Sequence, residues 1–273
     1  MKKIFMFIGL IVFLNAEVLD KIVATINDMP ITSYEVEKLS KQLNIDKNRA
    51  LNILLNQKLI ESEIKKRGIV VDNFELENAL EVIAKRNGFS LFEFKNILMQ
   101  RGDYQKLINQ IKNDLLKNKL FDEIVQTKLK IDDNEIKNYY QNHKNEFKVC
   151  KKIEVVKYSA NNKALLEKIK QNPLSIKNLK VENKIYYANE LPLNLLFLFK
   201  ETKDGAFTPI INESNERGYY SMFYVTKKEN YYYLPFEKVK NLITNKLINK
   251  KREKILKEYF SKLKNKAYVK FYN

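Results

Sequence analysis

Four copies of a helix-start motif narrow the possible folds of this chain more than any other feature. In a capping box, the first side chain accepts a hydrogen bond from the backbone N–H three residues later, and a glutamate at that position bonds back. The four boxes pair Thr32 with Glu35, Asp72 with Glu75, Ser90 with Glu93, and Asp132 with Glu135. Apolar residues flank each box on both sides. Residues 32–145 are therefore predicted to form short and medium helices with brief connections.

Apolar residues at helical spacing fill the intervals between these starts. One stripe belongs to a helix that Gly68 closes, and it consists of Leu51, Leu54, Leu55 and Leu59. A longer helix carries a second stripe, which consists of Leu107, Ile108, Ile111, Leu115 and Leu116. A third stripe follows Pro235 and consists of Val239, Leu242, Ile243, Leu247, Ile248, Ile255, Leu256, Phe260 and Leu263. The chain is thus predicted to be helical on both sides of its middle part.

The middle part differs, because short runs rich in β-branched and aromatic residues follow Phe147. Strands are expected at 152–158, 184–187 and 219–225, separated by a helix around 164–169 and by turns at proline and glycine. We predict a compact α/β insert over residues 146–229.

Two isolated strand-like segments, 21–26 and 267–271, lie at opposite ends of the chain. An isolated strand leaves its backbone groups unpaired, so we expect these two segments to pair with each other. Residues 17–145 and 230–273 then form one mainly helical body, and the fold class is α+β. Because the strands can pair within one chain or between two, a homodimer that exchanges terminal elements is an alternative to the monomer.

The first sixteen residues have the form of a secretory signal peptide. Lys2 and Lys3 precede an uncharged apolar run at 4–14, and Ala16 suits a cleavage site. The run is shorter than the roughly 20 residues that a membrane span needs. We expect residues 1–16 to be removed and the protein to be exported to the periplasm. A short N-terminal anchor that stays uncleaved is the alternative.

The formal net charge of +17 raises the alternative of a nucleic-acid or lipid-surface binder. The lysines are dispersed among acidic residues, however, which is typical of solvated helix faces, and an exported protein rarely meets nucleic acid. The single cysteine, Cys150, excludes an internal disulfide, and the single histidine, His143, excludes a multi-histidine metal site. Cys150 is expected to be packed and His143 to lie at the surface. No phosphate-binding glycine loop occurs, so no nucleotide or other cofactor is expected.

Several segments, in order and at matching spacing, resemble SurA and related periplasmic chaperones. The segments are 19–28, 30–36, 54–60, 68–72, 86–90 and 131–140. The resemblance covers nearly the whole chain after residue 16. It implies a helical, client-binding body that carries an inserted parvulin-like domain, the fold of a peptidyl-prolyl isomerase.

Within the insert, residues 191–205 resemble the parvulin stretch that forms one wall of a proline-binding pocket, with Leu191 and Leu195 in two of its apolar places. Residues 218–220 resemble the Gly-aromatic-His signature of the parvulins, but Tyr220 replaces the histidine. Glu154 stands where the first-strand histidine is expected. The resemblance therefore implies a peptide pocket at Glu154, Leu191, Leu195, Phe207, Tyr219 and Tyr220, although the apolar members also suit ordinary core packing. No catalytic residue is assigned.

The loss of both histidines bears on activity, because isomerisation rotates an amide across a barrier of about 18–20 kcal/mol and needs a pocket that favours the twisted form. We expect weak or absent turnover. The resemblance implies an ATP-independent holdase for unfolded outer-membrane or secreted proteins, and an active parvulin-type isomerase that assists their folding is the alternative. The run at 231–233, three tyrosines, is either part of a client-binding surface or a strand.

Overall fold

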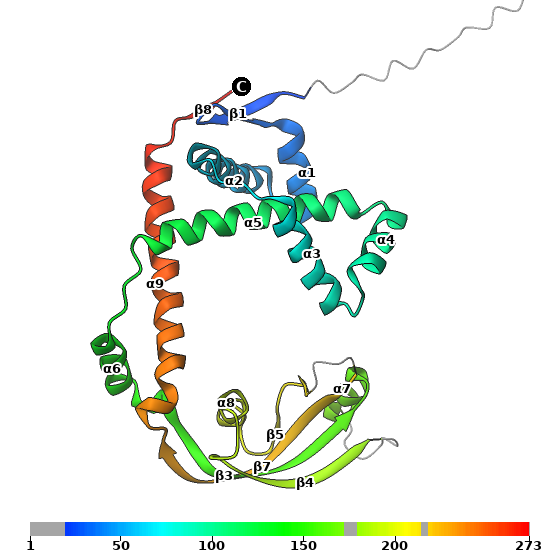
Figure 1. The fold of residues 1–273 in the computed structure, drawn as a ribbon, viewed down its shortest axis with the longest axis vertical. Helices are drawn as coiled ribbons and strands as arrows, with labels where there is room; N and C mark the ends of the chain where they lie inside the picture. Colours follow the sequence, from blue (N-terminus) through cyan, green and yellow to red (C-terminus); the bar gives the residue numbers. More distant parts are fainter. Residues whose placement is uncertain (1–19, 172–178, 214–217, 273) are drawn as a thin grey trace, which may run out of the picture. The chain divides into compact units, whose positions relative to one another are not determined.

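The computed structural model describes residues 20–171, 179–213 and 218–272, which form two compact units (Figure 1). The helical unit contains residues up to 80, 101–127 and those from 255 onward. The sheet unit contains residues 81–100 and 128–254. The division falls within α3 (Asn73–Arg86) and α9 (Phe236–Lys266), and before the last residue of α4 (Leu91–Arg101). The predicted signal peptide lies outside the described residues.

A three-stranded antiparallel sheet joins the two ends of the chain in the helical unit. Its strands β1 (Ile22–Ile26), β2 (Met29–Thr32) and β8 (Val269–Phe271) lie in the order β2-β1-β8. The turn between β1 and β2 contains Asn27 and Asp28, both with positive φ, as a two-residue hairpin turn of type I′ requires. The predicted pairing of the terminal strands is confirmed, since β1 and β8 are neighbours.

The helices of this unit include the two that the capping boxes at Thr32 and Asp72 open and the one that Gly68 closes. They are α1 (Ser33–Leu43), α2 (Lys47–Arg67), α5 (Tyr104–Gln126), the first part of α3 and the last part of α9. Gly68 takes the left-handed conformation that closes α2, with φ of 65°. The core of the unit is wholly aliphatic and consists of Ala24, Ile26, Ile31, Val36, Ala50, Leu54, Leu55 and Leu59.

The four predicted helix starts are confirmed by the starts of α1, α3, α4 (Leu91–Arg101) and α6 (Asp133–Asn142). The Glu35 backbone N–H donates to the Thr32 hydroxyl over 3.2 Å, and the Glu35 carboxylate accepts from the Thr32 N–H over 2.9 Å. Both hydrogen bonds also form at the boxes that open α3 and α4. These reciprocal bonds pair backbone groups that a helix N-terminus otherwise leaves free.

The sheet unit is built on an antiparallel sheet in the order β4-β3-β7-β5. These strands are β3 (Lys148–Ala160), β4 (Lys180–Tyr187), β5 (Ala206–Phe207) and β7 (Tyr220–Tyr233), and β6 (Ile211–Asn212) also pairs with β7. The predicted strands and the helix α7 (Lys163–Gln171) are present. β7 runs well past its predicted end and takes in all three tyrosines of the 231–233 run, so the strand explanation of that run is confirmed.

The two faces of this sheet carry different contacts, because successive side chains along a strand point to opposite faces. On one face, Ile153, Val155 and Phe223 pack with α8 (Leu193–Glu201). We call this the α8 face. On the other, which we call the α7 face, Ala160 and Met222 pack with Leu166 and Ile169 of α7.

The core on the α8 face reaches well outside the strands. Ile136 of α6 and three buried residues of α9 belong to the same apolar cluster as Ile153 and Phe223; these three are Val239, Ile243 and Leu247. The compact unit around this sheet is thus larger than residues 146–229, and the limits of the inserted domain stay a prediction. Among the residues described, no helix combines the length and the apolar content that crossing a membrane requires. The predicted α+β class is confirmed.

Candidate functional site

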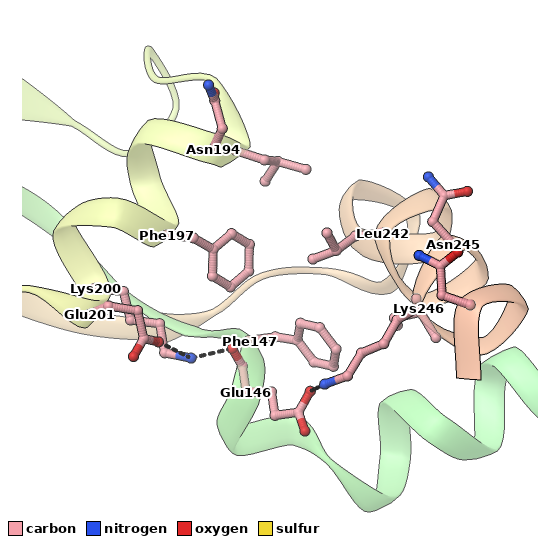
Figure 2. A pocket seen from close by; sticks show the side chains of 12 residues that line it. Glu146, Phe147, Asn194, Phe197, Lys200, Glu201, Leu242, Asn245 and Lys246 are labelled. Atoms are coloured by element: carbon pink, nitrogen blue, oxygen red, sulfur yellow. Dashed lines mark hydrogen bonds and ion pairs between the residues drawn. The ribbon is translucent and has the colours of Figure 1, made fainter. Parts of the chain in front are cut away.

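A groove of about 660 Å³ lies within the sheet unit, between α8, the 3-10 helix η1 (Lys144–Phe147) and the first half of α9 (Figure 2). Its apolar lining is Phe147, Leu193, Phe197, Leu242 and Ile243. Its polar lining is Glu146, Asn194, Lys200, Glu201, Asn245, Lys246 and Asn249. Figure 2 shows Phe197 of α8 and Leu242 of α9 pointing toward one another across it.

Helix α8 reaches the groove because it is apolar on two sides. Leu196 and Phe199 are buried against the sheet. Leu193 and Phe197, four residues apart and hence on one side of the helix, line the groove instead. On α9, Val239 and Ile243 are buried, whereas Leu242 keeps 42% of its surface exposed. The groove therefore presents the exposed side chain of Leu242 from α9 opposite Leu193 and Phe197 from α8, which are half-buried against the core of the sheet unit.

The charges at the rim are paired. Lys246 donates to the Glu146 carboxylate over 2.8 Å, and the Tyr139 hydroxyl donates to the same group over 2.9 Å. Burial acts to raise the pKa of Glu146, but these hydrogen bonds outweigh it and hold the pKa below its ordinary value. The hydrogen bond to Glu146 raises the pKa of Lys246. Both groups stay charged near neutral pH, so the rim offers balanced charge rather than a strong field of one sign.

The arrangement suits an apolar ligand better than an ionic one or a metal. The described ranges hold no group of three or more histidine, cysteine, aspartate or glutamate residues that could bind a metal ion. A mainly apolar groove with a few polar groups at its rim binds ligands by burial of apolar surface, and the polar groups orient them. An unfolded polypeptide with apolar side chains has this chemistry.

The residues predicted to form a peptide pocket are distributed over both faces of the sheet. Leu191 and Leu195 pack against the core of the α8 face. Phe207 and Tyr220 pack against the cluster on the α7 face. Tyr219 precedes β7 and borders a separate, smaller hollow.

Glu154 and Tyr220 share the α7 face but do not meet. Glu154 lies opposite Lys227, whereas Tyr220 lies opposite Ala160, six residues further along β3. At about 3.3 Å per residue this separation is roughly 20 Å. Glu154 instead accepts a hydrogen bond from Lys152, which also pairs with Glu229 over 3.3 Å. The structure thus places Phe207 beside Tyr158 and Tyr224, with ring centroids 5.8 and 5.0 Å apart, but not Glu154 beside Tyr220.

The groove residues Leu193, Phe197 and Lys246 were not among the predicted site residues. The sequence does contain a signal for Leu193 and Phe197, because the segment 193–199, in which both lie, is apolar at six of seven positions. A short helix that is apolar all round must be covered on more than one side. Leu242, which lines the opposite wall, lies 45 positions after Phe197 in the sequence. No helical or strand spacing connects residues so far apart, so Leu242 could not be assigned to this groove from the sequence.

The single cysteine and the single histidine take the roles expected of them. Cys150 is buried in the core of the sheet unit, and burial raises the pKa of its thiol. It is therefore a packed residue and not a reactive thiolate. His143 is exposed and its ring stacks on that of Tyr139, with centroids 4.1 Å apart.

Comparison with known proteins identifies the relatives of this chain. Residues 133–228 match the family model described as "Cj1289-like, C-terminal domain". A Chaperone SurA from Buchnera aphidicola subsp. Schizaphis graminum is 27% identical over 265 residues, which cover 90% of this chain and 52% of the relative. A Foldase protein PrsA from Caldanaerobacter subterraneus subsp. tengcongensis is 26% identical over 236 residues, which cover 82% of this chain and 70% of the relative. The chain thus spans about half the length of the SurA relative.

One solved structure matches over nearly its full length. It comes from work on the virulence factor PEB4 and the periplasmic protein Cj1289, described as two structurally related SurA-like chaperones of Campylobacter jejuni. It is 29% identical to this chain, with a TM-score of 0.64, and the match covers 93% of this chain and 99% of that one.

Proposed function

Because the chain belongs to the SurA-like group of chaperones and carries a Cj1289-like C-terminal domain, we propose that it is a periplasmic, ATP-independent holdase. It binds unfolded outer-membrane or secreted proteins after export by its cleaved signal peptide at residues 1–16. The relatives motivate the compartment and the client class. The groove between α8 and α9 supplies the binding chemistry.

The observation that carries this proposal is the partly exposed apolar lining of the groove. Leu193 and Phe197 from α8 lie opposite Leu242 from α9, and the rim is formed by paired charges and by asparagine side chains. Apolar surface in an open groove accepts many unrelated sequences, because burial of apolar area has no directional requirement. A holdase needs this low specificity.

We propose further that holding does not depend on prolyl isomerisation. Glu154 is engaged in a cluster of alternating charges with Lys152, Lys227 and Glu229, and it lies roughly 20 Å along β3 from the position of Tyr220. Glu154 and Tyr220 therefore do not form a polar pair that could stabilise a twisted amide at one point. In an assay limited by proline isomerisation, the rate should stay within about twofold of the uncatalysed rate; a rate tenfold higher, lowered by Leu195→Ala, would establish the isomerase alternative.

Aggregation of a chemically unfolded outer-membrane protein, measured by light scattering, tests the holdase function. The chain from residue 17 onward should suppress scattering at a small molar excess without nucleotide. Leu242→Ser should weaken suppression several-fold, because it removes apolar surface from one wall of the groove. Leu43→Ser is the matched control, since Leu43 is also an exposed helical leucine, at 53%, but lies in α1 of the helical unit.

Two results would count against the proposal. Scattering unchanged by the unaltered protein with every unfolded client would contradict the holdase function. Equal effects of Leu242→Ser and Leu43→Ser would remove the groove from it. Raising the salt concentration separates apolar from ionic binding, because a binder of nucleic acid or anionic lipid loses affinity steeply with salt.

A further inference from the structure

Strand β4 lies at one edge of the large sheet, and the register identifies its unpaired backbone groups. The Ala188 N–H donates to the Lys151 carbonyl over 2.9 Å, and the pairing of β4 with β3 continues from there without a shift. Hydrogen-bonded and non-hydrogen-bonded pairs alternate along an antiparallel ladder. The N–H and C=O groups that point away from β3 therefore belong to Val181, Asn183, Ile185 and Tyr187.

The same four residues carry the side chains of the α7 face. Their partners on β3 are Tyr158, Val156, Glu154 and Lys152. Three of the four are apolar and exposed, at 53% for Val181, 53% for Ile185 and 47% for Tyr187. The charged side chains of β4, those of Lys180, Glu182 and Lys184, alternate with them and lie on the α8 face. The edge is thus amphipathic with a period of two residues.

Three of the usual protections of a sheet edge, namely a very short strand, a proline and a bulge, are missing from β4. β4 is eight residues long, contains no proline, and pairs with β3 without a bulge. Its charged residues all lie on one face, so they do not block the approach of another strand to the backbone. Among the described residues, no other strand pairs with its outer side.

We propose that β4 binds an extended segment of an unfolded client as an added strand. The segment has apolar side chains at alternate positions, which lie beside Val181, Ile185 and Tyr187, and polar side chains between them, which lie on the α8 face. Backbone hydrogen bonds to β4 supply affinity without reading a sequence, and the alternation selects for amphipathic strands. This inference rests on the proposed holdase function and specifies the client class as chains that later form amphipathic β-strands.

A second copy of this chain is the weaker candidate for the same edge. Two eight-residue strands that pair edge to edge bury far less than the 1,200–2,000 Å² typical of a stable protein–protein interface. Weak, reversible pairing is insufficient for a lasting dimer, but it suits a holdase that must release its client.

Peptide binding to the full chain from residue 17 onward, followed by fluorescence anisotropy, tests the proposal. The probe is a labelled ten-residue peptide of alternating valine and threonine, and the comparison peptide has the same composition in a helical arrangement. The alternating peptide should bind at least tenfold more tightly. Two further peptides, with backbone N-methyl groups at odd or at even positions, should differ, with at least one losing tenfold or more.

Asn183→Pro is the decisive variant. Asn183 lies in a non-hydrogen-bonded pair with Val156, so proline removes an outward N–H and leaves the β3 ladder intact. Binding of the alternating peptide should fall at least tenfold, whereas Asn183→Ala, which keeps the N–H, should stay within about twofold. Circular dichroism checks that the proline variant folds. If it does not, the methylated peptides still decide.

The outcomes separate this inference from the proposed function. Unchanged peptide binding by folded Asn183→Pro, or equal binding of all the methylated peptides, would overturn the edge proposal while client holding by the unaltered protein stands. A dimer in analytical ultracentrifugation that Asn183→Pro abolishes, without peptide binding, would assign the edge to a second copy and overturn it too. Failure of the unaltered protein to hold any client would instead refute the proposed function.

Discussion

The core of the helical unit and the core of the sheet unit are built from different kinds of side chain. The core of the helical unit contains only alanine, valine, isoleucine and leucine side chains. The core of the sheet unit contains three buried phenylalanines, Phe147, Phe199 and Phe223, and partly buried tyrosines pack against it. Phe199 and Phe223 meet edge to face at 5.2 Å, and Tyr186 contacts both rings. Aromatic side chains bury more area each and fix their neighbours by geometry as well as by volume.

The helical unit has an aromatic contact between its helices, Phe121 of α5 with Phe260 of α9 at 5.5 Å, and beside it a charged clamp. Glu63 of α2 is 5% exposed and accepts hydrogen bonds from Arg67 over 2.8 Å and from the Tyr259 hydroxyl over 2.6 Å. Arg67 also reaches Glu123 of α5 and the Tyr259 oxygen on α9. Three helices from distant parts of the sequence thus meet at one guanidinium group. A small aliphatic core is thus complemented by a polar network whose groups are hydrogen-bonded to one another, and the network fixes the orientation of the three helices.

Among the substitutions that test this difference between the two cores, Phe223→Ala is expected to lower the free energy of unfolding most. It removes a fully buried ring that contacts Phe199 and Tyr186, and buried Phe→Ala changes cost about 3–5 kcal/mol. Urea unfolding followed by circular dichroism should show this loss in the free energy of unfolding. Phe92→Ala is the matched control, because Phe92 is 74% exposed and should change the value by under about 0.5 kcal/mol. Similar losses in both variants would contradict an aromatic core in the sheet unit.

A smaller but still large loss is expected from Arg67→Met. The change leaves Glu63 buried without its cation, and breaking a buried pair from one side costs about 3 kcal/mol. Lys41→Met removes the cation of an exposed pair with Glu37 and should cost under about 1 kcal/mol. Both values come from the same unfolding measurement. If the two variants lose equal stability, the clamp contributes no more than a surface ion pair.

The smallest expected effect is a pH dependence carried by Glu63. Burial acts to raise its pKa, but the hydrogen bonds from Tyr259 and Arg67 outweigh burial and lower the pKa below its ordinary value of 4.5. The folded state then binds fewer protons than the unfolded state, so this stability is present above about pH 4.5 and is lost as the pH falls through the folded pKa. Glu63→Gln should cost about 1 kcal/mol at pH 7 and much less at pH 3. A difference between the two proteins that does not shrink on acidification would contradict the assigned charge state.

Much of the fold could be predicted because its signals are local. A capping box such as Thr32 with Glu35 needs only four residues, and each of the four boxes opens a helix. The β1 and β8 pairing followed from the need of isolated strands for partners. The length of β7 could not be predicted, because its last residues pair with Lys148, Val149 and Cys150, and nothing local marks that pairing.

The candidate site was harder to predict, because it depends on which face each residue occupies. Leu195 and Phe207 follow the parvulin resemblance in sequence, yet they pack on opposite faces of the sheet. Phe197 and Leu242 line the same groove from two helices, and this placement is set by tertiary packing alone. The peptide pocket inferred from the resemblance stays a prediction, to be tested beside the groove and the β4 edge.

The sheet β2-β1-β8 also sets a limit on when the helical unit can finish folding. Ala24 pairs with Phe271, so the closing contact spans almost the entire chain. The entropy cost of closing such a loop grows only slowly with its length, at about 0.6 kcal/mol per doubling, but contacts this distant in sequence form late. During synthesis from the N-terminus, the edge of β1 that pairs with β8 stays without its partner until β8 has left the ribosome. The chaperone fold proposed here thus passes through the same vulnerable state as the clients that it is proposed to hold.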